Sequence, residues 1–122
     1  MAATKSLALE QVTKKEGEAL ETFIQRLLTE LGQQVVQVIL FGSKARGNST
    51  SDSDVDLLIL VKNEDRHLQK TISKISSQVD LDYDVLLNTL LIADKRWKQM
   101  SAERFSLCRN VERDGINLFS YS

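Results

Sequence analysis

The feature that most restricts the fold of this chain is an apolar run that ends in a turn of small residues. The run Val35–Phe41 is almost entirely apolar and rich in β-branched residues, which is typical of a strand covered on both faces. It is followed by Gly42 and Ser43, and Asp54 and Asp56 then open a second apolar run. A tight turn therefore leaves one buried strand, and paired carboxylates begin the next.

The remaining apolar residues recur mostly at helical intervals, so the expected order is helix, strand, strand, helix, strand, helix. The first helix should begin with a capping box formed by Thr13 and Glu16 and end at Gly32. The expected ranges are 9–31, 35–41, 54–61, 64–79, 81–87 and a largely helical 88–122.

These elements predict an α+β fold in which a small mixed sheet carries helices packed mainly on one face. The length of 122 residues fits a single domain over 1–122, with its core at 35–87 and a helical C-terminal part at 88–122.

Charge and cysteine content restrict the partners and the compartment. With 16 basic and 17 acidic residues, the net charge of -1 offers no electrostatic reason for direct binding to nucleic acid or to a membrane. Cys108 is the single cysteine, so an intramolecular disulfide is impossible and a reducing cytoplasm is the expected location. The first residues lack a signal-peptide core, and no apolar stretch approaches the length of a membrane span.

The paired acids indicate a metal site. Residues two apart in a strand point to the same face, with Cα atoms about 6.6 Å apart, so Asp54 and Asp56 should lie side by side. Two carboxylates on one rigid edge suit Mg²⁺. A third acid from the expected strand 81–87 would complete a site for two ions about 3.5–4 Å apart. Asp84 is the preferred candidate because an apolar run follows it directly, and Asp82 is the competitor.

The turn before the acids has the composition of a phosphate-binding loop. Gly42 permits unusual backbone angles and the close approach of a ligand. If the turn is helical, the free N–H groups at its start point outward beside the Ser43 hydroxyl, and Gly47 ends it. Lys44 and Arg46 would either neutralise phosphate charge or be solvated cations.

Two other motifs fail on residue types. The turn has the spacing of a Walker A loop, but Asn48 stands where that motif has its lysine. The segment that begins at Asp52 has Leu57 and Asn63 where a calcium loop needs glycine and glutamate.

The spacing of Gly42-Ser43, ten further residues and then Asp54-Val55-Asp56 resembles the signature of the DNA polymerase β-like nucleotidyltransferases. The short chain and the Gly-Ser-Lys-Ala-Arg-Gly form resemble the minimal nucleotidyltransferases of bacteria and archaea. The likeness is good over 35–87, and 109–115 also resembles the usual end of these proteins.

The resemblance implies roles for the residues that match. Gly42 and Ser43 would hold the nucleotide triphosphate, and Asp54 and Asp56 would bind Mg²⁺. The third carboxylate of the family would correspond to Asp84 or, as the alternative, Asp82.

The resemblance also implies a reaction and a partner. Small members of the family pair with HEPN-domain RNase toxins, so the expected activity is transfer of AMP from ATP to a tyrosine hydroxyl of such a toxin, with the chain acting as its antitoxin. Two rival functions remain open. One is an antitoxin that neutralises its partner by occlusion without chemistry, and the other is nucleotidyl transfer to a small molecule such as an aminoglycoside.

Overall fold

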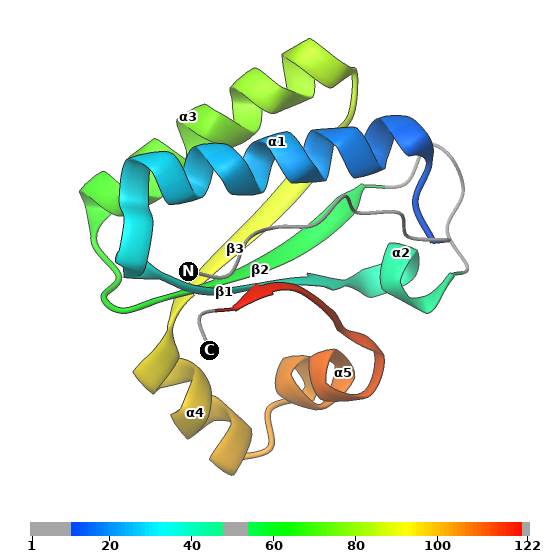
Figure 1. The fold of residues 1–122 in the computed structure, drawn as a ribbon. Coiled ribbons are helices and arrows are strands. Elements are labelled where there is room, and N and C mark those ends of the chain that lie inside the picture. The colour runs from blue at the N-terminus through cyan, green and yellow to red at the C-terminus, as the bar shows by residue number, and fades with distance from the viewer. Residues whose placement is uncertain (1–10, 48–53, 121–122) are drawn as a thin grey trace.

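The computed structural model describes residues 11–47 and 54–120, in which four strands form one mixed sheet (Figure 1). The elements in chain order are α1 (Lys14–Leu31), the 3₁₀ helix η1 (Gly32–Gln34), β1 (Val35–Phe41), α2 (Gly42–Arg46), β2 (Val55–Val61), α3 (Arg66–Tyr83), β3 (Leu87–Ala93), α4 (Asp94–Ala102), α5 (Ser106–Asp114) and β4 (Ile116–Ser120). The predicted α+β class with a mixed sheet is confirmed.

The beginning and end of α1 follow from local sequence. Thr13 caps the helix: its Oγ1 accepts the Glu16 N–H at 3.1 Å, and Glu16 Oε1 accepts the Thr13 N–H at 2.9 Å. Gly32 ends the helix with φ +54°. The predicted capping box and stop are therefore confirmed, while residues 9 and 10 of the expected helix lie outside the described range.

The sheet has the order β3-β2-β1-β4. Strand β1 is antiparallel to both β2 and β4, and β2 is parallel to β3 through the crossover helix α3. Strand β4 forms from a short apolar segment that the sequence analysis left within the helical C-terminal part. It pairs with β1 and so covers what would otherwise be an open edge of a buried strand.

The predicted third strand at 81–87 is wrong. Helix α3 continues through this segment to Tyr83, and the strand that pairs with β2 is Leu87–Ala93. Tyr83 lies four residues after Val79, so it extends the apolar stripe of the helix, and its hydroxyl hydrogen-bonds Thr22 of α1 at 2.6 Å. Because this tertiary contact favours the helix, Asp82 remains helical and Asp84 becomes the C-terminal cap.

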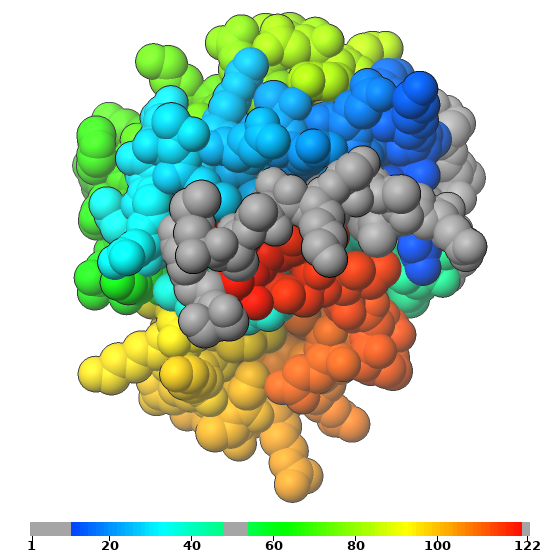
Figure 2. Space-filling model, in the orientation of Figure 1, coloured from blue at the N-terminus to red at the C-terminus, as the bar shows by residue number. Residues whose placement is uncertain are grey.

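Two apolar clusters lie on opposite faces of the sheet. The long helices α1 and α3 cover one face together with residues such as Val55 and Leu57, and α4 and α5 cover the other face together with Leu58 and Trp97 (Figure 1). The surface in Figure 2 shows α1 above the C-terminal segment and the two short helices below it. The strand ends between these layers hold the polar residues described next.

Strand β3 lies at an edge of the sheet. Because the Val55 N–H donates to Leu86 O, alternation directs the main-chain groups of the odd-numbered residues of β3 away from β2. Two of these outward N–H groups, at the two ends of β3, donate hydrogen bonds to side chains. The Leu87 N–H donates to Asp80 Oδ1 at 2.9 Å, and the Ala93 N–H donates to Glu64 Oε2 at 3.1 Å. These bonds attach the two ends of β3 to α3 and to the β2–α3 connection.

Of the helices that the structure describes, none combines the length and the apolar character needed to cross a lipid bilayer.

Candidate active site

The β1–α2 turn depends on Gly42, a position where any other residue would be strained. Gly42 has φ +76°, and a Cβ placed on it would collide with the Asp56 carboxylate, whose Cγ would lie only 3.1 Å away. The turn that follows is helical, and Gly47 ends it in the left-handed conformation with φ +75°, as predicted. The absent side chain of Gly42 therefore makes the space that the Asp56 carboxylate occupies.

The two acids begin β2. Asp54 directly precedes the strand and is exposed, whereas Asp56 is half-buried and pairs in register with Phe41 of β1. The residues that alternate with them, Val55 and Leu57, are fully buried under α1 and α3. The predicted alternation along this strand is confirmed, and it directs Asp56 to the face that carries α4 and α5.

Asn88 is a side chain of β3 that contacts Asp56, and the sequence analysis missed it. It lies opposite Asp56 in the parallel register of β2 and β3, and its Nδ2 donates to Asp56 Oδ1 at 2.9 Å. A correct boundary for β3 would have revealed it, because the same alternation that groups acids on β2 puts Asn88 beside them. The Asp56 carboxylate thus lies between Gly42 and Asn88.

The predicted third carboxylate does not lie on a neighbouring strand. Asp84 has φ +53° at the end of α3, its carboxylate is fully exposed, and its Oδ2 lies 3.7 Å from Lys15 Nζ. The alternative, Asp82, lies 3.4 Å from an Arg26 nitrogen on α1. Within residues 11–47 and 54–120, no group of three or more Asp, Glu, His or Cys side chains is arranged to hold a metal ion. The expected convergence of three aspartates is therefore not found there.

Asp80 is a further acid near the site. Its pKa is raised, mainly because burial disfavours the charged form, and the negative charge of Asp54 adds to this effect. The hydrogen bond from the Leu87 N–H acts in the opposite direction. The Asp80 carboxylate thus hydrogen-bonds the start of β3, and it lies close enough to Asp54 for the negative charge of Asp54 to act on it.

The sequence predicted that Lys44 would be either a phosphate ligand or a solvated cation, whereas the structure shows it buried in an ion pair. Its side chain is 2% exposed, and Nζ lies 2.8 Å from Glu16 Oε2, whose side chain is 6% exposed. Glu16 therefore joins the first turn of α1 to α2 through a buried ion pair, while its other oxygen completes the capping box. The role of Lys44 in the described structure is to hold the turn in place.

Ser43 and Arg46 are the polar residues of the turn that reach the surface. Ser43 is half-buried and Arg46 is exposed. The pKa of Asp114, at the end of α5, is lowered mainly by its hydrogen bond with Arg113, although desolvation opposes this, and the charge of Arg46 lowers it slightly further. The C-terminal helix therefore brings its charged end toward α2, as the contacts between α2 and α5 also indicate.

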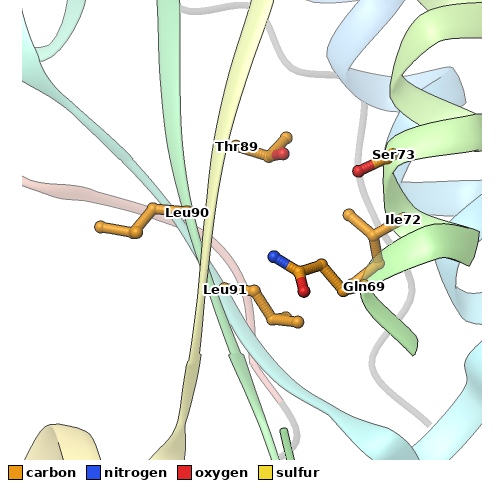
Figure 3. A pocket seen from close by; sticks show the side chains of 6 residues that line it. All are labelled: Gln69, Ile72, Ser73, Thr89, Leu90 and Leu91. Atoms are coloured by element: carbon orange, nitrogen blue, oxygen red, sulfur yellow. The ribbon is translucent and has the colours of Figure 1, made fainter. Parts of the chain in front are cut away.

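A small pocket lies elsewhere, between α3 and the edge strand β3. Figure 3 shows Thr89 and Leu91 directed toward α3, whereas Leu90 points away from that helix. The lining residues are Gln69, Ile72, Ser73, Thr89, Leu90 and Leu91. None of the candidate site residues lines this pocket, so it is separate from the acid pair.

Comparison with known proteins identifies the family. Residues 20–116, well over half of the chain, match the Nucleotidyltransferase domain family. Among curated proteins, the chain is similar to MJ0141 of Methanocaldococcus jannaschii, named as a candidate protein adenylyltransferase, with 41% identity over 75 residues that cover 61% of this chain and 76% of the relative. MJ0604 of the same organism, named in the same way, is 28% identical over 85% of this chain and 98% of its own length.

Solved structures show the same fold. A toxin–antitoxin complex with AMP-PNP contains a chain with a TM-score of 0.54 and 21% identity, over 82% of this chain and 73% of that one. A complex of the tri-AMPylated Shewanella oneidensis HEPN toxin with its MNT antitoxin gives a TM-score of 0.50 and 17% identity, over 88% and 73%. Together with the family match, the turn and the acids described above lead to one conclusion: this chain belongs to the nucleotidyltransferase domain family and is a nucleotidyltransferase.

Proposed function

We propose that the chain transfers AMP from ATP to a tyrosine hydroxyl of a HEPN-domain toxin and is the antitoxin of that pair. The observation that carries the proposal is the position of Asp56, held between Gly42 and Asn88 next to the exposed Asp54. Two further findings support it. Curated relatives are named as candidate protein adenylyltransferases, and similar folds occur in toxin–antitoxin complexes, one of them with an AMPylated HEPN toxin.

The residues present fit Mg²⁺ with a nucleotide. Mg²⁺ is commonly held by one or two carboxylates together with substrate phosphates, and Asp54 and Asp56 supply two hard oxygen donors at the edge of a rigid strand. When bound, the metal would neutralise phosphate charge. We assign Asp54 and Asp56 as its protein ligands.

The turn would hold the triphosphate. Gly42 lets a phosphate approach the main chain, and the Ser43 hydroxyl is the adjacent hydrogen-bond donor. Arg46 is the exposed cation of α2 and so the candidate for neutralising phosphate charge. Lys44 is left out of this assignment because it is buried against Glu16.

The chemistry would be in-line displacement at the α-phosphorus. The acceptor hydroxyl oxygen forms a bond to the α-phosphorus and releases its proton to solvent water, while the bond between the α-phosphorus and the bridging oxygen breaks and pyrophosphate leaves with the bonding electrons. Such a reaction depends on positioning and on charge stabilisation more than on covalent catalysis. The fixed orientation of Asp56 supplies the positioning, and the exposed Asp54 leaves an open side from which the acceptor can approach.

The decisive experiment combines purified protein, ATP, Mg²⁺ and HEPN proteins of the same organism, with intact-mass spectrometry as the readout. The wild type should add AMP units to its partner. Asp56→Asn should lower the rate by at least about 100-fold, because it removes charge stabilisation from the reacting phosphate while the packing beside Gly42 is kept. Asp84→Asn is the matched control, since it also neutralises an aspartate but one that lies on the α3 cap, and it should retain the wild-type rate.

Two results would contradict the proposal. Full transfer by Asp56→Asn would remove the role of the acid pair. Inhibition of the toxin without any gain in mass would instead support neutralisation by occlusion.

A further inference from the structure

We propose that Asn88 is a positioning residue of the site: it holds the Asp56 carboxylate for the metal-bound nucleotide and supplies a neutral amide in place of a third acid. The inference rests on the proposed function and goes beyond it, because it assigns a role to a residue outside the Gly-Ser and Asp-x-Asp signature. It begins with the contact between Asn88 Nδ2 and Asp56 Oδ1 at 2.9 Å.

The two oxygens of Asp56 have different neighbours. Oδ2 lies against Gly42, where a Cβ would collide with it, and Oδ1 accepts from Asn88. An ionised carboxylate can only accept hydrogen bonds, so the amide must present its NH₂ group to Asp56 and its carbonyl oxygen to the other side. The carboxylate is thus fixed from both sides before any ligand binds.

The position of Asn88 is itself fixed by the start of β3. The Val55 N–H donates to Leu86 O, and Asp80 accepts the Leu87 N–H at 2.9 Å. A slip of one residue in a strand would turn Asn88 to the opposite face, so these two bonds determine which side chain faces Asp56. Asp80 therefore acts indirectly, through the register of the strand.

The charge of the site explains why an amide suits this position. A carboxylate at the place of Asn88 would bring two negative groups to within hydrogen-bond distance, and the pair would repel each other unless a cation lay between them. The amide attracts Asp56 instead. The amide therefore adds no further negative charge beside Asp56, and the metal is expected to bind mainly together with the nucleotide phosphates.

The test measures the Mg²⁺ concentration that gives half of the maximal rise in melting temperature, with a non-hydrolysable ATP analogue present. Asn88→Ala should raise this midpoint by about 10- to 100-fold, the usual effect of removing a group that orients a metal ligand. Asn117→Ala is the matched control: it removes an asparagine on β4 that accepts from Gln37 at 2.9 Å, and its Mg²⁺ midpoint should equal that of the wild type.

A second variant separates positioning from general packing. Asn88→Asp should lower the melting temperature of the metal-free protein, because two carboxylates then face each other, and Mg²⁺ should stabilise this variant more than the wild type. A purely structural role would give the same loss with and without Mg²⁺.

The outcomes distinguish this inference from the proposed function. If Asn88→Ala keeps the wild-type midpoint, or if the wild type shows no response to Mg²⁺ with the analogue, the role of Asn88 is overturned. If the midpoints shift as expected but no HEPN protein gains AMP, then the acceptor assignment fails while the role of Asn88 holds.

Discussion

Lys15 and Glu16 are consecutive residues of α1, yet their ion pairs lie in opposite surroundings. Glu16 meets Lys44 of the β1–α2 turn at 2.8 Å in a buried site, whereas Lys15 meets Asp84 at 3.7 Å, where the carboxylate is fully exposed. Helix α1 thus contacts the β1–α2 turn through a buried ion pair and the end of α3 through an exposed one. The turn that would hold the phosphates is anchored by a buried ion pair, whereas the ion pair at the α3–β3 junction is open to solvent.

The same contrast holds for the apolar residues. Ala45 of the turn is buried in the main core, but Leu81 and Leu86, on either side of the junction, are 81% and 58% exposed. Burial therefore holds the turn, whereas the junction, although Tyr83 and Leu87 pack against the same core, also carries two leucines on the surface.

The largest effect is expected at the buried ion pair. Lys44→Met should lower the free energy of unfolding by about 3–5 kcal/mol, because it leaves the Glu16 carboxylate buried without its partner charge. Urea denaturation followed by circular dichroism would measure the change. Replacing both members, Lys44→Met with Glu16→Leu, should recover part of the loss, although the second change also removes the capping box.

If Lys44→Met loses less than about 1 kcal/mol, then water reaches this pair and the contrast between the two sides of the site disappears.

A smaller effect is expected at the glycine of the turn. Gly42→Ala should cost about 1–3 kcal/mol, because the new methyl group overlaps the Asp56 carboxylate, and AMP transfer should fall with it. Gly47→Ala is the matched control: Gly47 has nearly the same φ, +75° against +76°, but the atom nearest to its added Cβ is Gln11 Cγ at an ordinary contact distance of 3.8 Å. Both variants carry backbone strain, so the difference between their unfolding free energies isolates the contact with Asp56.

Equal losses in the two glycine variants would show that Asp56 moves aside freely, which contradicts its fixed orientation.

The smallest effect is expected at the exposed pair. Asp84→Asn should change the free energy of unfolding by no more than about 1 kcal/mol, and added salt should reduce even that difference. Denaturation curves at low and high ionic strength would test this. A loss comparable to that of Lys44→Met would mean that the junction is as firmly held as the turn.

Much of the fold and part of the site follow from local sequence. The capping box at Thr13, the turn from Gly42 to Gly47 and the alternation around Asp54 and Asp56 are all encoded within a few neighbouring residues. Such features depend on main-chain angles and on side-chain period, which the sequence displays directly.

The rest depends on contacts between distant segments. The boundary of α3 shifts because Tyr83 bonds Thr22, sixty-one residues away, and this shift moves the acids at 82 and 84 off the sheet. The pairing of Lys44 with Glu16 is equally non-local, and neither residue type predicts burial. Asn88 was missed for the same reason, since its role appears only when β3 is aligned with β2.

The carboxylates of Asp80 and Glu64 have a further consequence for the behaviour of the chain at high concentration. By occupying the outward N–H groups of Leu87 and Ala93, they leave an incoming strand with donors only at the middle of β3. The two ends of this edge are thereby protected against pairing with a strand of another copy, even though the adjoining junction exposes leucines. Asp80 thus both protects one end of the β3 edge and helps to align Asn88 with Asp56.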